Sequence, residues 1–138
     1  MKNRIIKFRA WDKKDKIMYY DIQKGIKFTD LSHYNFDEFL GNPNGMRDYH
    51  EWEVMQYTGL LDKSGKEIYE GDIVKVPDSY DYNSSPSTTY VNEEVFWSED
   101  RLCWFLVFGG YFEMELYRVK DIEVIGNFYE NASILDNK

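Results

Sequence analysis

The chain has 138 residues, of which 18% are aromatic, and its formal net charge is −8. This length fits one domain, or two small subdomains that share a core. No apolar run approaches the roughly 18 to 20 residues of a membrane helix, and residues 1–9 lack the apolar stretch of a secretion signal. Cys103 is the single cysteine, which excludes an internal disulfide. The composition therefore predicts a cytoplasmic protein.

The charge is unevenly distributed along the chain. Residues 1–50 contain ten Lys or Arg and seven Asp or Glu, a net charge of +3, whereas residues 51–138 contain seven and eighteen, a net charge of −11. Affinity for a phosphate backbone depends mainly on Lys and Arg, so an acidic chain is an unfavourable nucleic-acid binder. The basic N-terminal part could still contact nucleic acid or the acidic half of another copy, or simply form solvated strand faces.

The N-terminal part has the pattern of a β-hairpin. Residues 4–10 alternate, with Ile6, Phe8 and Ala10 on one face, and residues 17–20 return after a polar turn. We expect Trp11, at the end of the hairpin, to cover the core.

Two further elements are predicted before the middle of the chain. Asn35 precedes acidic and apolar residues up to Leu40, which predicts one or two helical turns. Ile26 and Phe28 suggest a short strand, and alternation in residues 50–57 predicts a longer one.

Residues 56–76 are marked by three glycines, Gly59, Gly65 and Gly71, spaced six apart. That spacing predicts repeated turns of the backbone. The last glycine precedes the β-branched residues 73–76, which predict a strand. We expect this segment to connect a hairpin and short-helix subdomain, residues 1–54, to a second subdomain, residues 55–138.

The C-terminal part predicts a meander of strands. Residues 77–89 are polar and without periodicity, which indicates a loop that is either mobile or functional. The apolar run 102–108 predicts a strand covered on both faces, and Gly109-Gly110 predicts a tight hairpin after it. A short helical turn is expected at residues 131–135. The five expected strands are 73–76, 90–97, 102–108, 111–118 and 122–128.

The predicted fold class is therefore mainly β. An N-terminal hairpin region would pack on a C-terminal, partly open five-stranded barrel of the SH3-like kind, with one or two short helical turns.

No set of residues forms a recognisable reaction centre. Residues 62–67 lack the pattern of a calcium loop, because glycine stands at position 4 and Lys at positions 2 and 5. Glu67, Glu70 and Asp72 could form a carboxylate cluster, or Asp72 could cap a turn while both Glu are solvated.

Neither the histidines and the cysteine nor the aromatic residues form a recognisable metal, catalytic or base-stacking site. His33, His50 and Cys103 are too few for a three-ligand metal site without carboxylates, and the apolar strand around Cys103 disfavours a thiolate. Trp97 and Trp104 could stack bases, but residues 90–130 hold only three basic residues, which favours core packing. We predict no enzyme activity, no cofactor and no metal.

Four collinear segments carry a resemblance to a known family. They are Ile6-Lys7-Phe8-Arg9-Ala10-Trp11-Asp12 with Met18-Tyr19, residues 55–60, residues 62–74 and residues 124–131. In these segments the sequence resembles the YopX family of phage and prophage proteins. The residues of the structural family motif are Tyr57, Gly59, Gly65, Tyr69, Gly71 and Asp72. The resemblance implies a phage-derived cytoplasmic protein with a β-rich fold, no assigned reaction and, by analogy, a homo-oligomer.

The leading hypothesis is a phage or prophage accessory protein that acts through protein–protein contacts, with copies of itself and with an unknown host or phage protein. A second hypothesis is nucleic-acid binding through the basic hairpin residues Lys7, Arg9, Lys13, Lys14 and Lys16. A third is DNA mimicry by the acidic half, which would occupy the DNA site of a host protein. A membrane partner is not expected.

Overall fold

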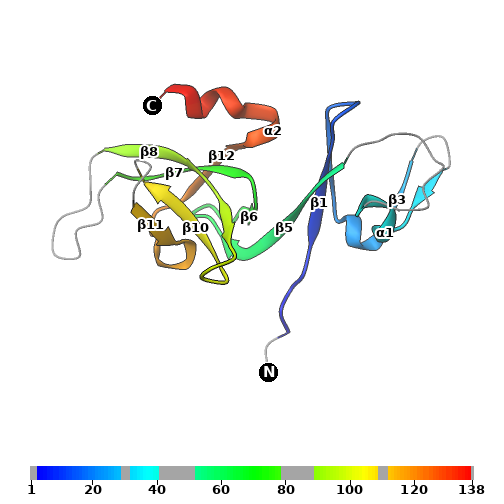
Figure 1. Ribbon diagram of the computed structural model, residues 1–138, viewed down its shortest axis with the longest axis horizontal. Coiled ribbons are helices and arrows are strands. Elements are labelled where there is room, and N and C mark those ends of the chain that lie inside the picture. The colour runs from blue at the N-terminus through cyan, green and yellow to red at the C-terminus, as the bar shows by residue number, and fades with distance from the viewer. Residues whose placement is uncertain (1–2, 29–31, 41–51, 79–88, 109–111, 138) are drawn as a thin grey trace. The chain divides into compact units, whose positions relative to one another are not determined.

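The computed structural model describes residues 3–28, 32–40, 52–78, 89–108 and 112–137. The chain forms two compact units, Met1–Tyr57 and Thr58–Lys138 (Figure 1). The predicted fold class is confirmed: the fold is mainly β, with only short helices. The expected domain boundary, between residues 54 and 55, falls inside the longest strand.

The first unit is built on an antiparallel hairpin, as predicted. Strand β1 (Phe8–Asp12) pairs with β2 (Ile17–Tyr20) on one side and with the first part of β5 (Trp52–Leu61) on the other. The hairpin strand begins at Phe8 and not at residue 4. Residues 3–7 lie outside every strand.

Short elements complete the first unit. Strands β3 (Ile26–Lys27) and β4 (His33–Tyr34) pair with each other, and a 3-10 turn, η1, covers Ile22–Lys24. Helix α1 (Phe36–Phe39) follows Asn35, whose backbone N–H donates to Glu38 Oε1 at 3.3 Å. The predicted helical turn is therefore confirmed.

The core of the first unit is rich in aromatic side chains. Its fully buried members are Ala10, Ile22 and Phe39, and most of the partly buried side chains packed against them are aromatic. The Trp52 ring meets Phe39 edge-on, with ring centroids 4.9 Å apart. Trp11 is buried, so it is not an exposed contact, but it does not belong to this core cluster.

The second unit contains two three-stranded antiparallel sheets. In one, β7 (Asp72–Pro77) lies between β8 (Tyr90–Glu94) and β12 (Glu123–Asn127). In the other, β10 (Cys103–Phe108) lies between β9 (Phe96–Ser98) and β11 (Phe112–Glu115). The five predicted strands are present in these sheets.

The expected strand 90–97 is divided at Val95, because Val95 is fully buried and its backbone N–H donates to Asp72 O at 2.9 Å. This interruption lets the chain leave the sheet of β7 and enter the sheet of β10. The expected strand 111–118 is also shorter than predicted, since a 3-10 turn, η2 (Leu116–Arg118), follows β11. Helices α2 (Phe128–Asn131) and η3 (Ala132–Asn137) close the chain, and η3 contacts β8. The SH3-like character of the barrel stays a prediction.

One hydrophobic core joins the two sheets of the second unit. It includes Ile68 of β6 (Glu67–Tyr69), Val74 and Val76 of β7, and Leu106 and Phe108 of β10. The prediction that residues 102–108 are covered on both faces is wrong. Only alternate side chains of β10 enter the core.

The prediction that all three glycines of residues 56–76 make turns is wrong for Gly59. Gly59 lies inside β5 with a φ of +88°, and β5 continues past it to become the neighbour of β6. Gly65 and Gly71 do lie in turns, with φ of +87° and +80°, a region that favours glycine. Residues 79–88 of the expected loop 77–89, and the hairpin at Gly109-Gly110, lie outside the described residues.

Candidate functional site

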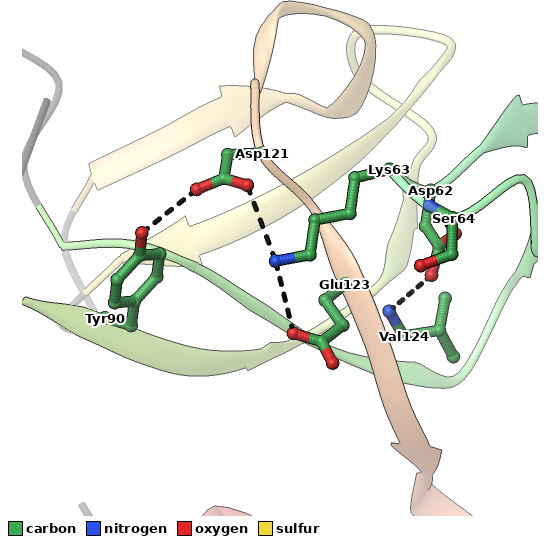
Figure 2. A network of polar contacts seen from close by, with 7 residues as sticks. All are labelled: Asp62, Lys63, Ser64, Tyr90, Asp121, Glu123 and Val124. Atoms are coloured by element: carbon green, nitrogen blue, oxygen red, sulfur yellow. Dashed lines mark hydrogen bonds and ion pairs between the residues drawn. The ribbon is translucent and has the colours of Figure 1, made fainter.

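The turn after β5 is organised by the Asp62 carboxylate. Asp62 Oδ1 accepts hydrogen bonds from the backbone N–H groups of Ser64 at 2.8 Å and Lys66 at 2.9 Å. Its Oδ2 accepts from Val124 N at 3.0 Å (Figure 2). Burial raises the pKa of Asp62, but these three N–H groups and the Lys66 charge outweigh it and hold the pKa below 3.8. The carboxylate is thus a hydrogen-bond acceptor within a turn, which confirms the predicted turn of the backbone around Gly65.

Lys63 adds an exposed polar network beside this turn. Its Nζ lies 3.6 Å from Asp121 Oδ1 and 3.4 Å from Glu123 Oε2. The Tyr90 hydroxyl donates to Asp121 Oδ2 at 3.1 Å (Figure 2), and this bond raises the pKa of Tyr90 above 10.0. The Lys75 ammonium lies 5.2 Å from the centroid of the Tyr90 ring. These contacts connect the turn to β8 and β12 across the surface, where each ion pair contributes little stability.

Asp72 has the turn-capping role that the sequence allowed for it. Its side chain is buried, and Oδ2 accepts from Tyr69 N at 2.8 Å. Glu67 and Glu70 remain partly exposed. Burial, and then the negative charge of Glu70, raise the pKa of Glu94 above 4.5. Across the described part of the chain, no group of three or more His, Cys, Asp or Glu is placed to hold a metal ion.

Two of the segments that carry the family resemblance, residues 62–74 and 124–131, meet in the second unit. In the β7–β12 pair, Gly126 lies opposite Ile73 and Asn127 opposite Asp72. Phe128 N donates to Gly71 O at 2.9 Å. Asn127 also caps α2, because its Oδ1 accepts from Tyr129 N and Glu130 N. Together with the bond from Val124 N to Asp62, these contacts give residues 62–74 and 124–131 a structural role.

The two tyrosines of the motif are also buried. Tyr69 is 3% exposed and Tyr57 is 7% exposed. The Lys7 ammonium lies 5.7 Å from the centroid of the Tyr57 ring. Neither phenol is therefore presented to a ligand on the surface.

The structure does not bring the five basic hairpin residues onto one exposed face. Arg9 is only 3% exposed, and its guanidinium carbon lies 5.9 Å from the Tyr20 ring centroid. Lys13 Nζ lies 2.7 Å from Glu53 Oε1. Lys14 and Lys16 are exposed in the turn between β1 and β2.

Sequence reasoning missed a partly apolar surface on the second unit. Phe105 lies opposite Phe96 of β9 and opposite Glu115 of β11, and Val107 lies opposite Glu113. Directly opposed residues share a face of a sheet, so these five side chains form one surface, which we call the open face. Phe96 is 41% exposed, and its ring centroid lies 5.9 Å from that of Phe105.

The margin of the open face on β11 carries two carboxylates that are paired with arginines, among them Arg118, whose Nη1 lies 3.3 Å from Glu115 Oε2. Arg101 Nε lies 3.7 Å from Glu113 Oε2, and Arg101 Nη1 lies 3.9 Å from Glu115 Oε1. The alternation of Glu113 and Glu115 along β11 is a signal that could have revealed this face. Two carboxylates on alternate positions indicate a solvated side of the sheet, which the neighbouring β10 must share.

The aromatic residues of β9 and β10 differ in their exposure. Trp104 packs against the core, whereas Trp97 is 40% exposed and meets Trp104 with ring centroids 4.9 Å apart. The prediction of core packing therefore holds for Trp104 alone.

Together, the fold and this site define a small, mainly β protein whose motif segments are occupied by turn-forming contacts. A family model described as YopX protein matches residues 7–136, and the chain belongs to the YopX family. The crystal structure of protein EF1440 from Enterococcus faecalis is similar, with 26% sequence identity and a TM-score of 0.58 over 96% of this chain and 99% of that chain. A search of curated proteins finds no match. None of the helices in the described ranges is long and apolar enough to cross a membrane.

Proposed function

We propose that this protein is a phage or prophage accessory protein of the bacterial cytoplasm that works through protein–protein contacts, as a homo-oligomer and without catalysis. The observation that carries the proposal is the open face. Its side chains Phe96, Phe105 and Val107 leave a row of apolar surface in contact with solvent. Phe96 is 41% exposed, and Phe105 and Val107 beside it are half-buried. A contiguous apolar surface of this kind, rimmed by charge, is typical of an interface.

The distribution of charge supports association between copies. The first unit has ten Lys or Arg and nine Asp or Glu, a net charge of +1. The second unit has seven and sixteen, a net charge of −9. Attraction between the first unit of one copy and the second unit of another favours head-to-tail association and speeds their encounter.

The roles of the carboxylates support a function without catalysis. Asp62 and Asp72, the buried acids of the motif, are both engaged by backbone N–H groups that close turns. The pKa of Asp62 lies below its ordinary value of 3.8, so its carboxylate is a weak base at neutral pH.

The mass of the full chain in solution tests the proposal. We expect a mass above that of one chain at micromolar concentration, and a clear loss of association for Phe96→Asp. Tyr117→Asp is the matched control, because Tyr117 is a more exposed aromatic residue outside the open face. Equal loss in the two variants, or a wild-type monomer, would contradict the proposal.

Nucleic-acid binding by the basic hairpin remains the alternative proposal. It is supported by the exposure of Lys14 and Lys16 in the turn. Mimicry of DNA by the acidic second unit is supported by the net charge of −9.

A further inference from the structure

We infer that residues 3–7 of one copy, the N-terminal arm, bind the open face of a second copy. This inference rests on the proposed homo-oligomer and names the two surfaces that would form it. Each copy then contributes one arm and receives one.

The arm is an apolar and basic segment that lies outside the strands of its own unit, although its last residue, Lys7, is bonded to β5. It contains Arg4, Ile5, Ile6 and Lys7 in succession, and Ile5 and Ile6 are 61% and 55% exposed. Tyr57 N donates to Lys7 O at 2.9 Å, so the arm is held at the residue next to β1. Figure 1 shows the remaining residues leading away from β1 toward the N-terminus. Two adjacent exposed β-branched residues form a short segment that is suited to lie extended across a sheet.

The open face complements the arm in both apolarity and charge. Its apolar residues Phe96, Phe105 and Val107 can receive one of the two isoleucines, since adjacent side chains of an extended segment point to opposite faces. The carboxylates of Glu113 and Glu115 border this apolar part on β11, where both pair with Arg101 and Glu115 also pairs with Arg118. The side chain of Glu113 is 43% exposed, and its ion pair with Arg101 is long at 3.7 Å. A carboxylate offers several acceptor positions, so Glu113 retains capacity for a cation from the arm.

Because the arm and the open face are different surfaces, two copies can exchange arms in a two-fold dimer, or the contact can be heterologous and repeat from copy to copy. Repetition of such a contact closes into a ring or extends as a fibre. A fixed mass that does not rise with concentration would indicate a dimer or a ring.

The test measures association of the full chain by light scattering, with variants on each surface. We expect Ile5→Ser combined with Ile6→Ser to weaken association by at least about tenfold, and Arg4→Glu and Glu113→Lys each to weaken it by a factor of several. Arg4→Glu combined with Glu113→Lys restores opposite charges and should recover association. Lys14→Glu is the control, since Lys14 is an exposed basic residue outside the arm. Circular dichroism establishes that each variant is folded.

The outcomes separate this inference from the proposed function. If the wild type associates and the isoleucine variant associates equally well, the inference is overturned and the homo-oligomer stands. Failure of the double charge variant to recover overturns the assignment of the arm to the open face. A wild-type monomer overturns both.

Discussion

Asp62 and Val124 are joined by a hydrogen bond in which Val124 N donates to Asp62 Oδ2 at 3.0 Å. The other oxygen of the same carboxylate holds the turn formed by residues 62–66. One side chain therefore closes a local turn and attaches it to strand β12. Both residues lie in segments that carry the resemblance to the YopX family, which gives these segments a physical reason to occur together.

Replacement of Asp62 by Ala should destabilise the protein. The variant leaves three backbone N–H groups without their acceptor, which we expect to lower the free energy of unfolding by about 2 kcal/mol or more. Lys63→Ala is the control, because it removes only exposed ion pairs of the same turn. Chemical denaturation measures both. Equal stabilities of the two variants would contradict the role of Asp62.

The stabilisation by Asp62 should depend on pH in a defined direction. The pKa of Asp62 in the folded protein lies below its ordinary value of 3.8. A lowered folded pKa means that the contribution is fully present above the unfolded pKa and is lost as the pH falls through the folded value. The difference in unfolding free energy between wild type and Asp62→Ala should therefore be constant near neutrality and shrink below about pH 4. Denaturation over a pH series measures it, and a difference that grows on acidification would contradict the account.

Gly126 should be intolerant of a side chain because Asn131 lies against it. A Cβ at Gly126 would meet Asn131 Oδ1 at 2.6 Å, and this oxygen accepts from Asn127 N at 3.2 Å. Gly126→Ala is expected to cost about 1–3 kcal/mol of stability through overpacking. The cost should be smaller when Asn131→Gly is already present, because that change removes the clashing atoms. A double-mutant cycle measures this coupling, and purely additive effects would refute the steric explanation.

The alternation of apolar and polar residues along the sequence predicted most strands of both units correctly. The hairpin of β1 and β2, the helical turn after Asn35 and the strands of the second unit all followed from local pattern. Gly59 could not be placed in the same way, because spacing alone does not separate a glycine in a turn from one in a strand. Its position depends on neighbours: Thr58 Oγ1 donates to Ile68 O at 2.7 Å and accepts from Leu60 N, which continues β5 past the glycine.

The candidate surfaces were harder to predict than the strands. The apolar run of β10 has the composition of a strand buried on both faces, but tertiary packing fully buries only Leu106 and Phe108 on one face and leaves Phe105 and Val107 on the other half-buried. Arg9 belongs to a basic segment, yet its side chain is almost fully buried. In both cases the exposure of a side chain depends on which distant segments pack against its strand. The local sequence does not contain that information.

The basic hairpin is expected to bind nucleic acid weakly at most. The burial of Arg9 and the ion pair between Lys13 and Glu53 leave few free cations to displace counterions. We expect the mobility of DNA and RNA in a gel to be unchanged at about 50 mM salt. Retardation that is lost when Lys14 and Lys16 are both changed to Glu would favour the nucleic-acid alternative instead.

The central claim is that copies of this chain associate through complementary surfaces. Its most direct test is the mass of the wild-type protein in solution at micromolar concentration, measured at about 0.1 M and about 1 M salt. At about 1 M salt, the attraction between charges more than about 3 Å apart is screened, so charge pairs between copies are weakened. The account predicts an oligomer at low salt and a weakened oligomer at high salt. A monomer at both salt concentrations would contradict it.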